Sequence, residues 1–143
     1  MVVGGSWANA TIREARFRRV AFQGVRVTGA DFASGSLKDV SFTDCRVDLA
    51  SFRFTSLQHV LFDRCRLDEI DFYGAALESV TFRRCVMPNG VWAEATLTRC
   101  EMREVDISGS VNPERLRGVR MPWPDVLSAA GVLAAAAGVE IVD

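Results

Sequence analysis

Residues 40–67, VSFTDCRVDLASFRFTSLQHVLFDRCRL, repeat one pattern with a period of five residues. A large apolar side chain stands at every fifth position, as at Phe42, Val47 and Phe52. A small or β-branched residue stands two positions earlier, and the other three positions are mostly polar, charged or glycine. A helix has a period of 3.6 and a strand a period of 2, so neither element accounts for a period of five.

The period of five continues on both sides of this stretch without interruption. It runs from Trp7 to Ile107, and all 21 positions are large and apolar. In a chain with 49% hydrophobic residues, chance produces such a run roughly once in three million trials before the five phases are counted. The pattern therefore indicates a repeated structural unit, which we expect to turn a corner every five residues.

Four such units would close a square coil of 20 residues, and a period of 20 is visible in the side chains. One side of the coil carries Phe22, Phe42, Phe62 and Phe82, and the opposite side carries Phe32, Phe52, Phe72 and Trp92. The remaining two sides are mainly aliphatic, which keeps the volume of each layer nearly constant, as close packing requires. Stacked coils would bury a continuous core through contacts between neighbouring repeats.

The units resemble the pentapeptide repeat family, whose loose consensus is Ala-(Asp/Asn)-Leu-x-x. Ala30-Asp31-Phe32, Ala50-Ser51-Phe52 and Ile70-Asp71-Phe72 carry the likeness. The resemblance covers about residues 5–110 and implies an all-β solenoid, a right-handed quadrilateral parallel β-helix of about five coils. With coils spaced ~4.8 Å apart, as parallel strands are, the rod would be roughly 25 Å long.

The rest of the chain is predicted to cover the ends of this solenoid. Residues 1–4 are predicted as a short leader. Residues 111–143 are predicted as an imperfect last coil, in which the period slips to Val111, Leu116 and Met121, then a capping helix at about 124–137 and a short strand at 139–142. The helix either caps the core or also forms a two-fold dimer contact, as the family resemblance allows; both readings use the cap residues Trp123, Val126, Leu127, Ala130, Leu133 and Ala134.

Composition and motifs narrow the classes of function. The chain has no apolar stretch long enough to span a membrane and no signal peptide, and four cysteines in a small inward register are expected to be reduced core residues in the cytoplasm. Their spacings of 20, 20 and 15 do not suit a metal site. His59 is expected at a solvated corner, and no nucleophile, base and pocket converge. The sequence therefore predicts no catalytic residue, no metal, no cofactor and no membrane or direct nucleic-acid partner.

Charged and aromatic residues in outward positions are the candidate contact residues. The basic residues are 16 arginines and one lysine, and the net charge is −1. Arg26, Arg46 and Arg66 recur every 20 residues and should form a ladder up one wall, either as a salt-bridged solvent face or as a stripe that docks on an anionic partner. Phe54 and Tyr73 should lie close together and form, with Arg53, a small aromatic–cationic patch.

The sequence favours a non-catalytic protein-binding module, because a regular rod presents rigid, charged walls. The family resemblance implies a named partner, since quinolone-resistance and toxin-immunity members bind DNA gyrase or topoisomerase IV by resembling a DNA duplex. The alternative is a structural or assembly scaffold that dimerises through the C-terminal helix and has no topoisomerase role. Gyrase supercoiling measured with and without the protein would separate the two.

Overall fold

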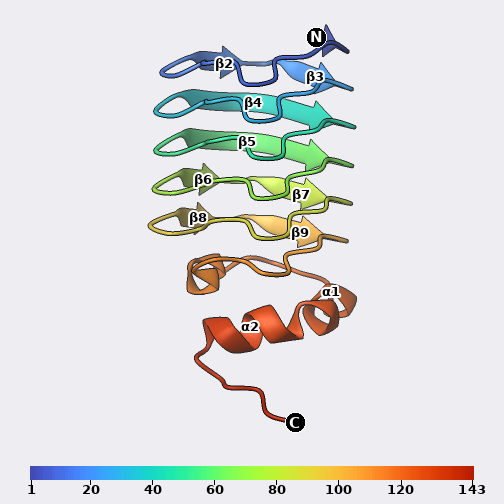
Figure 1. Cartoon of the computed structure of the whole chain (residues 1–143), viewed down its shortest axis with the longest axis vertical. Helices are drawn as coiled ribbons and strands as arrows, with labels where there is room; N and C mark the ends of the chain where they lie inside the picture. Colours follow the sequence, from blue (N-terminus) through green and yellow to red (C-terminus); the bar gives the residue numbers. More distant parts are fainter.

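The protein is a rod of stacked coils closed at one end by helices (Figure 1). The computed structural model describes all residues 1–143. Nine strands form one parallel sheet: β1 (Val2–Val3), β2 (Arg16–Arg18), β3 (Ala21–Gln23), β4 (Ser36–Thr43), β5 (Ser56–Asp63), β6 (Ala76–Glu78), β7 (Thr81–Arg83), β8 (Thr96–Thr98) and β9 (Glu101–Arg103). They are followed by the 3-10 helix η1 (Pro113–Leu116) and the α-helices α1 (Trp123–Ser128) and α2 (Ala130–Ala136). The architecture confirms the predicted parallel β-solenoid of about five coils.

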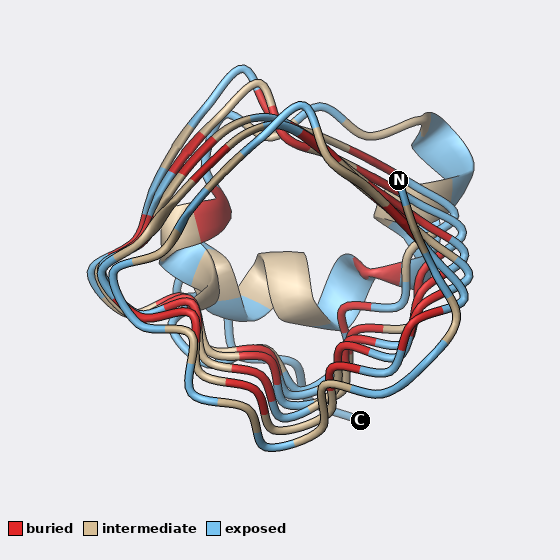
Figure 2. Cartoon of the chain, turned by 90° about the horizontal axis from the view of Figure 1, so that it is seen from above, coloured by how far each residue is buried: buried red, intermediate tan, exposed pale blue.

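Each coil pairs with the next in a register of 20 residues. Between β4 and β5 the partners include Leu37 with Leu57 and Phe42 with Phe62. Figure 2, a view along the rod, shows the coils superimposed around one axis, with the buried segments on their walls. The chain turns its corners at residues in the left-handed conformation, of which Asp44 (φ 54°) is one. Its amide donates a hydrogen bond to the Asp63 carbonyl of the next coil (3.0 Å), so pairing between coils offsets the cost of the positive φ.

Two columns of aromatic rings fill the core. Phe42, Phe62 and Phe82 are stacked with ring centroids 5.0 and 5.1 Å apart and interplanar angles of 4° and 5°. The opposite column places Phe52 over Phe72, and Trp92 ends it. This stacking confirms the convergence of every fifth side chain on the axis of the rod.

The cysteines lie in the small inward register, where their thiols are buried and free. The Cys65 thiol donates a hydrogen bond to the Phe42 carbonyl (3.2 Å), and the Thr55 hydroxyl makes the equivalent bond to Phe32 (2.9 Å). Hydrogen bonding to Cys45 and Cys85, together with burial, raises the pKa of the Cys65 thiol above its usual value. Cys65 therefore acts in the fold as a small packing residue with one donor.

We expect Cys65→Thr to change the free energy of unfolding by less than about 1 kcal/mol, because the hydroxyl keeps the bond to the Phe42 carbonyl as Thr55 does at its own site. Cys65→Leu should cost about 2–3 kcal/mol, because Cys65 is already fully buried in a packed core and the larger side chain would overpack it. Equilibrium denaturation of both variants measures the difference. Equal losses in the two variants would contradict this role for the thiol.

The last coil is one residue shorter than the others, but the residue is lost at a later point than the sequence pattern predicted. Val111 still pairs with Val91 in the register of 20, and it is 47% exposed, so its predicted inward position is wrong. The lost residue falls later, because Glu101 pairs with Arg120. The 3-10 helix η1 begins at Pro113 and takes up this slip, and Leu116 within it is buried at the end of the core.

The capping helix is bent into two. The Ser128 hydroxyl donates a hydrogen bond to the Pro124 carbonyl (3.1 Å), a contact that bends helices, and α1 ends at this residue. The bend buries Ala129 against the core, with Val132 and Leu133 packed beside it. Leu127 and Ala130 were among the predicted cap residues, and both are exposed, so these two do not cover the core.

The two ends of the chain also differ from the prediction. Val2–Val3 is not a leader but the strand β1, which pairs with β3. Trp7 packs edge-on against Phe22, with ring centroids 5.4 Å apart, and remains partly exposed. No strand forms at residues 139–142, because the helices hold this segment away from the coils and it has no strand to pair with. None of the helices has the length and apolar character that crossing a membrane requires.

Candidate protein-interaction surface

The predicted arginine ladder runs along one wall of the rod. Arg26, Arg46 and Arg66 are neighbours in successive coils and all three are exposed. Because the coils are hydrogen-bonded to one another, the three positions are held at the spacing of parallel strands, ~4.8 Å.

Aspartates two residues along the chain partly neutralise the ladder. The Arg66 guanidinium contacts Asp68 at 3.0 Å, and Arg46 lies 3.8 Å from Asp48. Asp48 also accepts a hydrogen bond from Thr28 (2.8 Å), whereas Arg26 has no carboxylate partner and contacts only the Thr28 hydroxyl. Solvent-exposed pairs of this kind add little to stability, so the arginines remain able to exchange partners.

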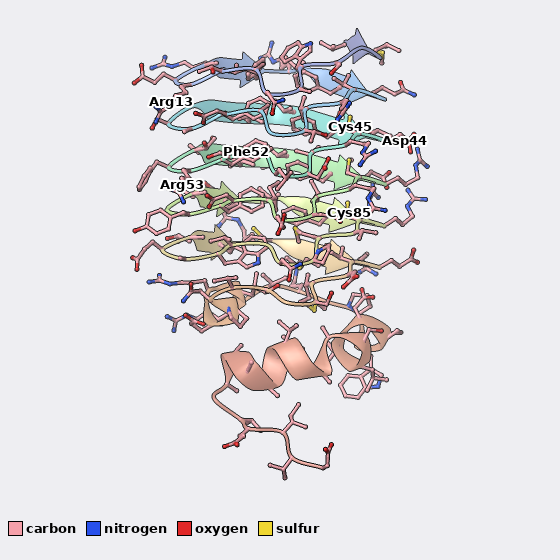
Figure 3. The ribbon with its side chains drawn as sticks, in the orientation of Figure 1. Arg13, Asp44, Cys45, Phe52, Arg53 and Cys85 are labelled. Carbon is pink, nitrogen blue, oxygen red and sulfur yellow. The ribbon has the colours of Figure 1, made fainter.

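The structure brings Arg53, Phe54 and Tyr73 together on the next wall. The rings of Phe54 and Tyr73 meet edge to face, with centroids 5.5 Å apart at 84°. The Arg53 guanidinium carbon lies 5.4 Å from the centre of the Tyr73 ring. Phe54 is 60% exposed although it is a large apolar residue. We call these three residues the aromatic patch; Figure 3 shows Arg53 projecting from the same edge of the rod as Arg13.

Asp71 holds the aromatic patch in place through both of its carboxylate oxygens. One oxygen accepts the Tyr73 amide (2.9 Å), which fixes the turn, and the other accepts the Arg53 guanidinium (2.5 Å). The hydrogen bond that Arg53 donates to Asp71, together with the negative charge of Asp71, raises the pKa of Arg53. Asp31 repeats this arrangement earlier on the same wall, where it binds the Ala33 amide (2.9 Å) and pairs with Arg13 (3.4 Å).

Gly74 provides the seat for the Phe54 ring. A Cβ atom at Gly74 would lie 2.6 Å from the ring, so only glycine lets the ring lie flat against the next coil. The Phe54 ring thus packs on the next coil and against the Tyr73 ring while most of it stays exposed, which lowers the conformational entropy that would be lost when a partner covers it.

Comparison with protein families places this geometry in a known group. The family described as "Pentapeptide repeat region" matches residues 15–90, more than half of the chain. The chain belongs to the pentapeptide repeat family. No curated protein sequence matches this pentapeptide repeat protein at a significant level.

Several solved structures share the fold. QnrB1, a plasmid-mediated fluoroquinolone resistance protein studied after trypsin treatment, aligns with a TM-score of 0.55 at 13% identity over 99% of this chain and 100% of its own. Rfr23 from the cyanobacterium Cyanothece aligns with a TM-score of 0.54 at 12% identity, over 74% of this chain and 90% of its own. HetL from the cyanobacterium Nostoc, involved in heterocyst differentiation regulation, aligns at 0.53 and 17% identity, over 82% and 62%. At these identities the likeness establishes the fold alone.

Sequence reasoning missed a charged cluster on the opposite part of the rod. The Asp63 side chain is only 10% exposed, and both its oxygens accept hydrogen bonds from Arg84 (3.1 and 2.8 Å). Arg64 makes a similar two-point contact with Asp44 (2.8 and 3.2 Å). The separation of 21 residues between Asp63 and Arg84 crosses from one column to the next, so a search along columns of 20 does not find the pair.

The pentapeptide repeat protein presents the predicted cap residues on two different surfaces. Leu133 packs on the core, and Val126 and Ala134 are partly buried. Trp123 (69% exposed) and Leu127 (59% exposed) lie on the outer surface of the helices, as does Ala130. The residues that the sequence assigned to one cap or dimer face are therefore split, and only the second set is free to meet another molecule.

A groove of about 670 Å³ separates α2 from the last coil. It is lined by Val105, Ile107 and the small side of α2, including Gly131 and Ala135, with Glu104, Asp106 and Asp125 among the polar groups. The small residues of α2 leave this space open. His59, which the sequence placed at a solvated corner, is not part of this groove and lies on another wall of the rod.

Proposed function

We propose that this pentapeptide repeat protein is a non-catalytic protein-binding module whose partner is a type II DNA topoisomerase, DNA gyrase or topoisomerase IV. The proposal rests on one observation, the exposed aromatic patch fixed on a rigid wall by Asp71 and Gly74. Aromatic and arginine side chains of this kind dominate the binding energy of protein interfaces. As part of the proposal we expect the protein to act in the cytoplasm.

The charge of the central coils supports a partner that normally binds DNA. Residues 31–80 contain nine acidic and five basic residues, a net charge of −4. A groove that receives a DNA duplex is positively charged, so an acidic rod is attracted to it. The similarity of fold to the fluoroquinolone resistance protein QnrB1 points to the same class of target.

The proposed contact residues lie on two neighbouring walls, with the apolar contacts on one and the charged contacts on the other. Phe54 and Tyr73 supply apolar area at the centre of the contact. The Arg53 guanidinium, now paired with Asp71, can form an ion pair with a carboxylate of the partner instead. Arg26, Arg46 and Arg66 on the neighbouring wall would form charged contacts at the rim, where their exposed ion pairs are easily exchanged.

Supercoiling by DNA gyrase, with and without a fluoroquinolone, tests the proposal. The protein should inhibit supercoiling or protect the enzyme from the drug, and R53E/F54A should weaken that effect about tenfold or more, as loss of an interface hot spot does. The matched control is R13E, because Arg13 makes the same kind of ion pair on the same wall without an aromatic neighbour. If a large excess of the wild-type protein has no effect, or if R13E and R53E/F54A behave alike, the proposal is wrong.

The second candidate function is a structural or assembly element without a topoisomerase role. The observation in its favour is the exposed apolar surface of the helices, where Trp123 and Leu127 stand one helical turn apart. In its simplest form two copies would meet at this surface as a two-fold dimer. Sedimentation of the purified protein tests whether it self-associates at all.

A further inference from the structure

The exposed large apolar residues of the protein are concentrated at the two ends of the rod. Leu49, Phe54 and Val111 lie on the walls; the other seven are Met1, Val3, Trp123, Leu127, Val139, Ile141 and Val142. The first coil adds Trp7, Ile12 and Phe17, which pack on the core but remain partly exposed. Both ends of the rod therefore present an apolar surface, and Figure 1 shows that they face in opposite directions.

The two ends carry opposite charge. Residues 1–30 contain five arginines and one glutamate, a net charge of +4. Residues 121–143 contain Asp125, Glu140 and Asp143 and no basic residue, a net charge of −3. Arg16, Arg18 and Arg19 are exposed and make no ion pair within the chain, although most of the other arginines do. Glu140 and Asp143 are likewise exposed and unpaired.

The backbone at the basic end also has an open edge. Strand β2 pairs with β4 on one side only, so its other side is free to accept a further strand. The segment 139–142 lies beyond α2 and pairs with no strand, and Val139, Glu140 and Ile141 alternate apolar and polar residues, which is the pattern of a strand that covers a core on one face.

We propose that copies of this protein associate head to tail, with the acidic helical end of one copy seated on the basic first coil of the next. The tail of the first copy then runs in the same direction as the coils that follow it, so it can extend the sheet as a parallel strand. In that register Glu140 meets Arg16 and Ile141 covers Phe17, while Asp143 reaches Arg19. The outer helix residues Trp123 and Leu127 cover the remaining apolar rim of the first coil.

Charge decides between this arrangement and a two-fold contact of the helices. A two-fold dimer would bring two ends of charge −3 together, and like charges at an interface oppose binding. The head-to-tail contact joins +4 to −3. Because its two surfaces differ, it does not close on itself and would build short linear chains of rods. The inference specifies the contact for the second candidate function, assembly, on which it rests, and it is independent of the topoisomerase proposal.

Sedimentation velocity with two complementary charge variants tests the inference. R16E/R18E damages only the basic end, and E140K/D143K damages only the acidic end. The wild-type protein should form dimers and longer species between ~10 µM and ~1 mM, the range in which small interfaces dissociate, and raised salt should reverse this. Each variant alone should self-associate at least about tenfold more weakly than the wild type, because each copy keeps only one of the two binding surfaces.

The mixture of the two variants gives the decisive result. Neither variant should self-associate well alone, but both kinds of contact in the mixture join opposite charges, because the two reversed ends are complementary to each other as the two unchanged ends are. The mixture should therefore recover association, first as a 1:1 complex and then as longer alternating species. R46E, a wall variant with the same change of sign, should associate as the wild type does, and thermal unfolding should show that all variants are folded. Undiminished self-association of both variants would support a two-fold dimer of the helices, which needs neither the basic first coil nor the acidic tail, and would overturn this geometry while leaving assembly in place. A wild-type protein that stays monomeric throughout would overturn both.

Discussion

Phe62→Ala should lower the free energy of unfolding by about 4 kcal/mol and the melting temperature by roughly 10 °C or more. Phe62 is completely buried, stacked between Phe42 and Phe82 at centroid distances of 5.0 and 5.1 Å. Phe52 meets it edge-on at 6.3 Å, so the ring has aromatic neighbours on three sides. The cost lies near the upper end of the usual range because the backbone bonds between coils prevent the neighbouring layers from closing over the cavity.

Chemical denaturation followed by circular dichroism measures this loss, and Phe54→Ala is the matched control. Both variants remove the same atoms, but Phe54 is 60% exposed and its loss should change the free energy of unfolding by about 0.5 kcal/mol or less. A loss below about 1.5 kcal/mol in Phe62→Ala would show that the column does not carry the stability of the rod. Because solenoid repeats contact only their neighbours, the transition of Phe62→Ala should also become less cooperative.

The interior of the rod could be predicted from the sequence because the same five-residue pattern of inward side chains occurs 21 times. Each unit repeats the choice of one large and one small inward residue, so a misfit at one position does not hide the period. The aromatic columns, the cysteine column and the closeness of Phe54 and Tyr73 all follow from counting in steps of five and 20. The parts that recur are those that sequence reasoning described correctly.

The ends could not be predicted in the same way because each occurs once. The bend of the helix depends on a hydrogen bond from Ser128 to the Pro124 carbonyl, and the helical period does not show it. At that bend Ala129 enters the core, and Leu127, one of the predicted cap residues, faces outward. The predicted terminal strand at 139–142 lacked a partner strand, since pairing is a property of the surroundings and not of the segment.

The candidate contact surface was predictable in composition but not in detail. The ladder of Arg26, Arg46 and Arg66 follows from the register, whereas its neutralisation by Asp48 and Asp68 depends on side-chain conformations within one coil. The seat that Gly74 provides for Phe54 depends on contact between two coils. Such contacts decide how firmly a surface side chain is held, and therefore how well it can serve as a binding anchor.

The second large effect is expected at Gly35, where the repeat pattern and the structure predict opposite signs. Gly35 occupies the small inward register, in which the equivalent residues of other coils are Ala15, Thr55 and Ala75. By that pattern Gly35→Ala should be neutral or stabilise the protein by up to about 1 kcal/mol, because it reduces the freedom of the unfolded chain. In the structure, a Cβ atom at Gly35 would lie 2.6 Å from the Ala15 carbonyl oxygen, closer than real contacts allow.

The clash is with the backbone of the preceding coil, so a change of side-chain rotamer cannot relieve it. The Ala15 carbonyl accepts the Ser36 amide (3.0 Å), and moving it would break the pairing of the first two coils. We therefore expect Gly35→Ala to cost about 2 kcal/mol, measured by denaturation. The comparison variant is Gly24→Ala, which has a positive φ of 63° but no atom within 4 Å of the new methyl group. It should cost only about 1 kcal/mol, because other coils hold Asp44 and Arg64 at the same corner. A Gly35→Ala protein as stable as the wild type would mean that the first coil moves freely relative to the second.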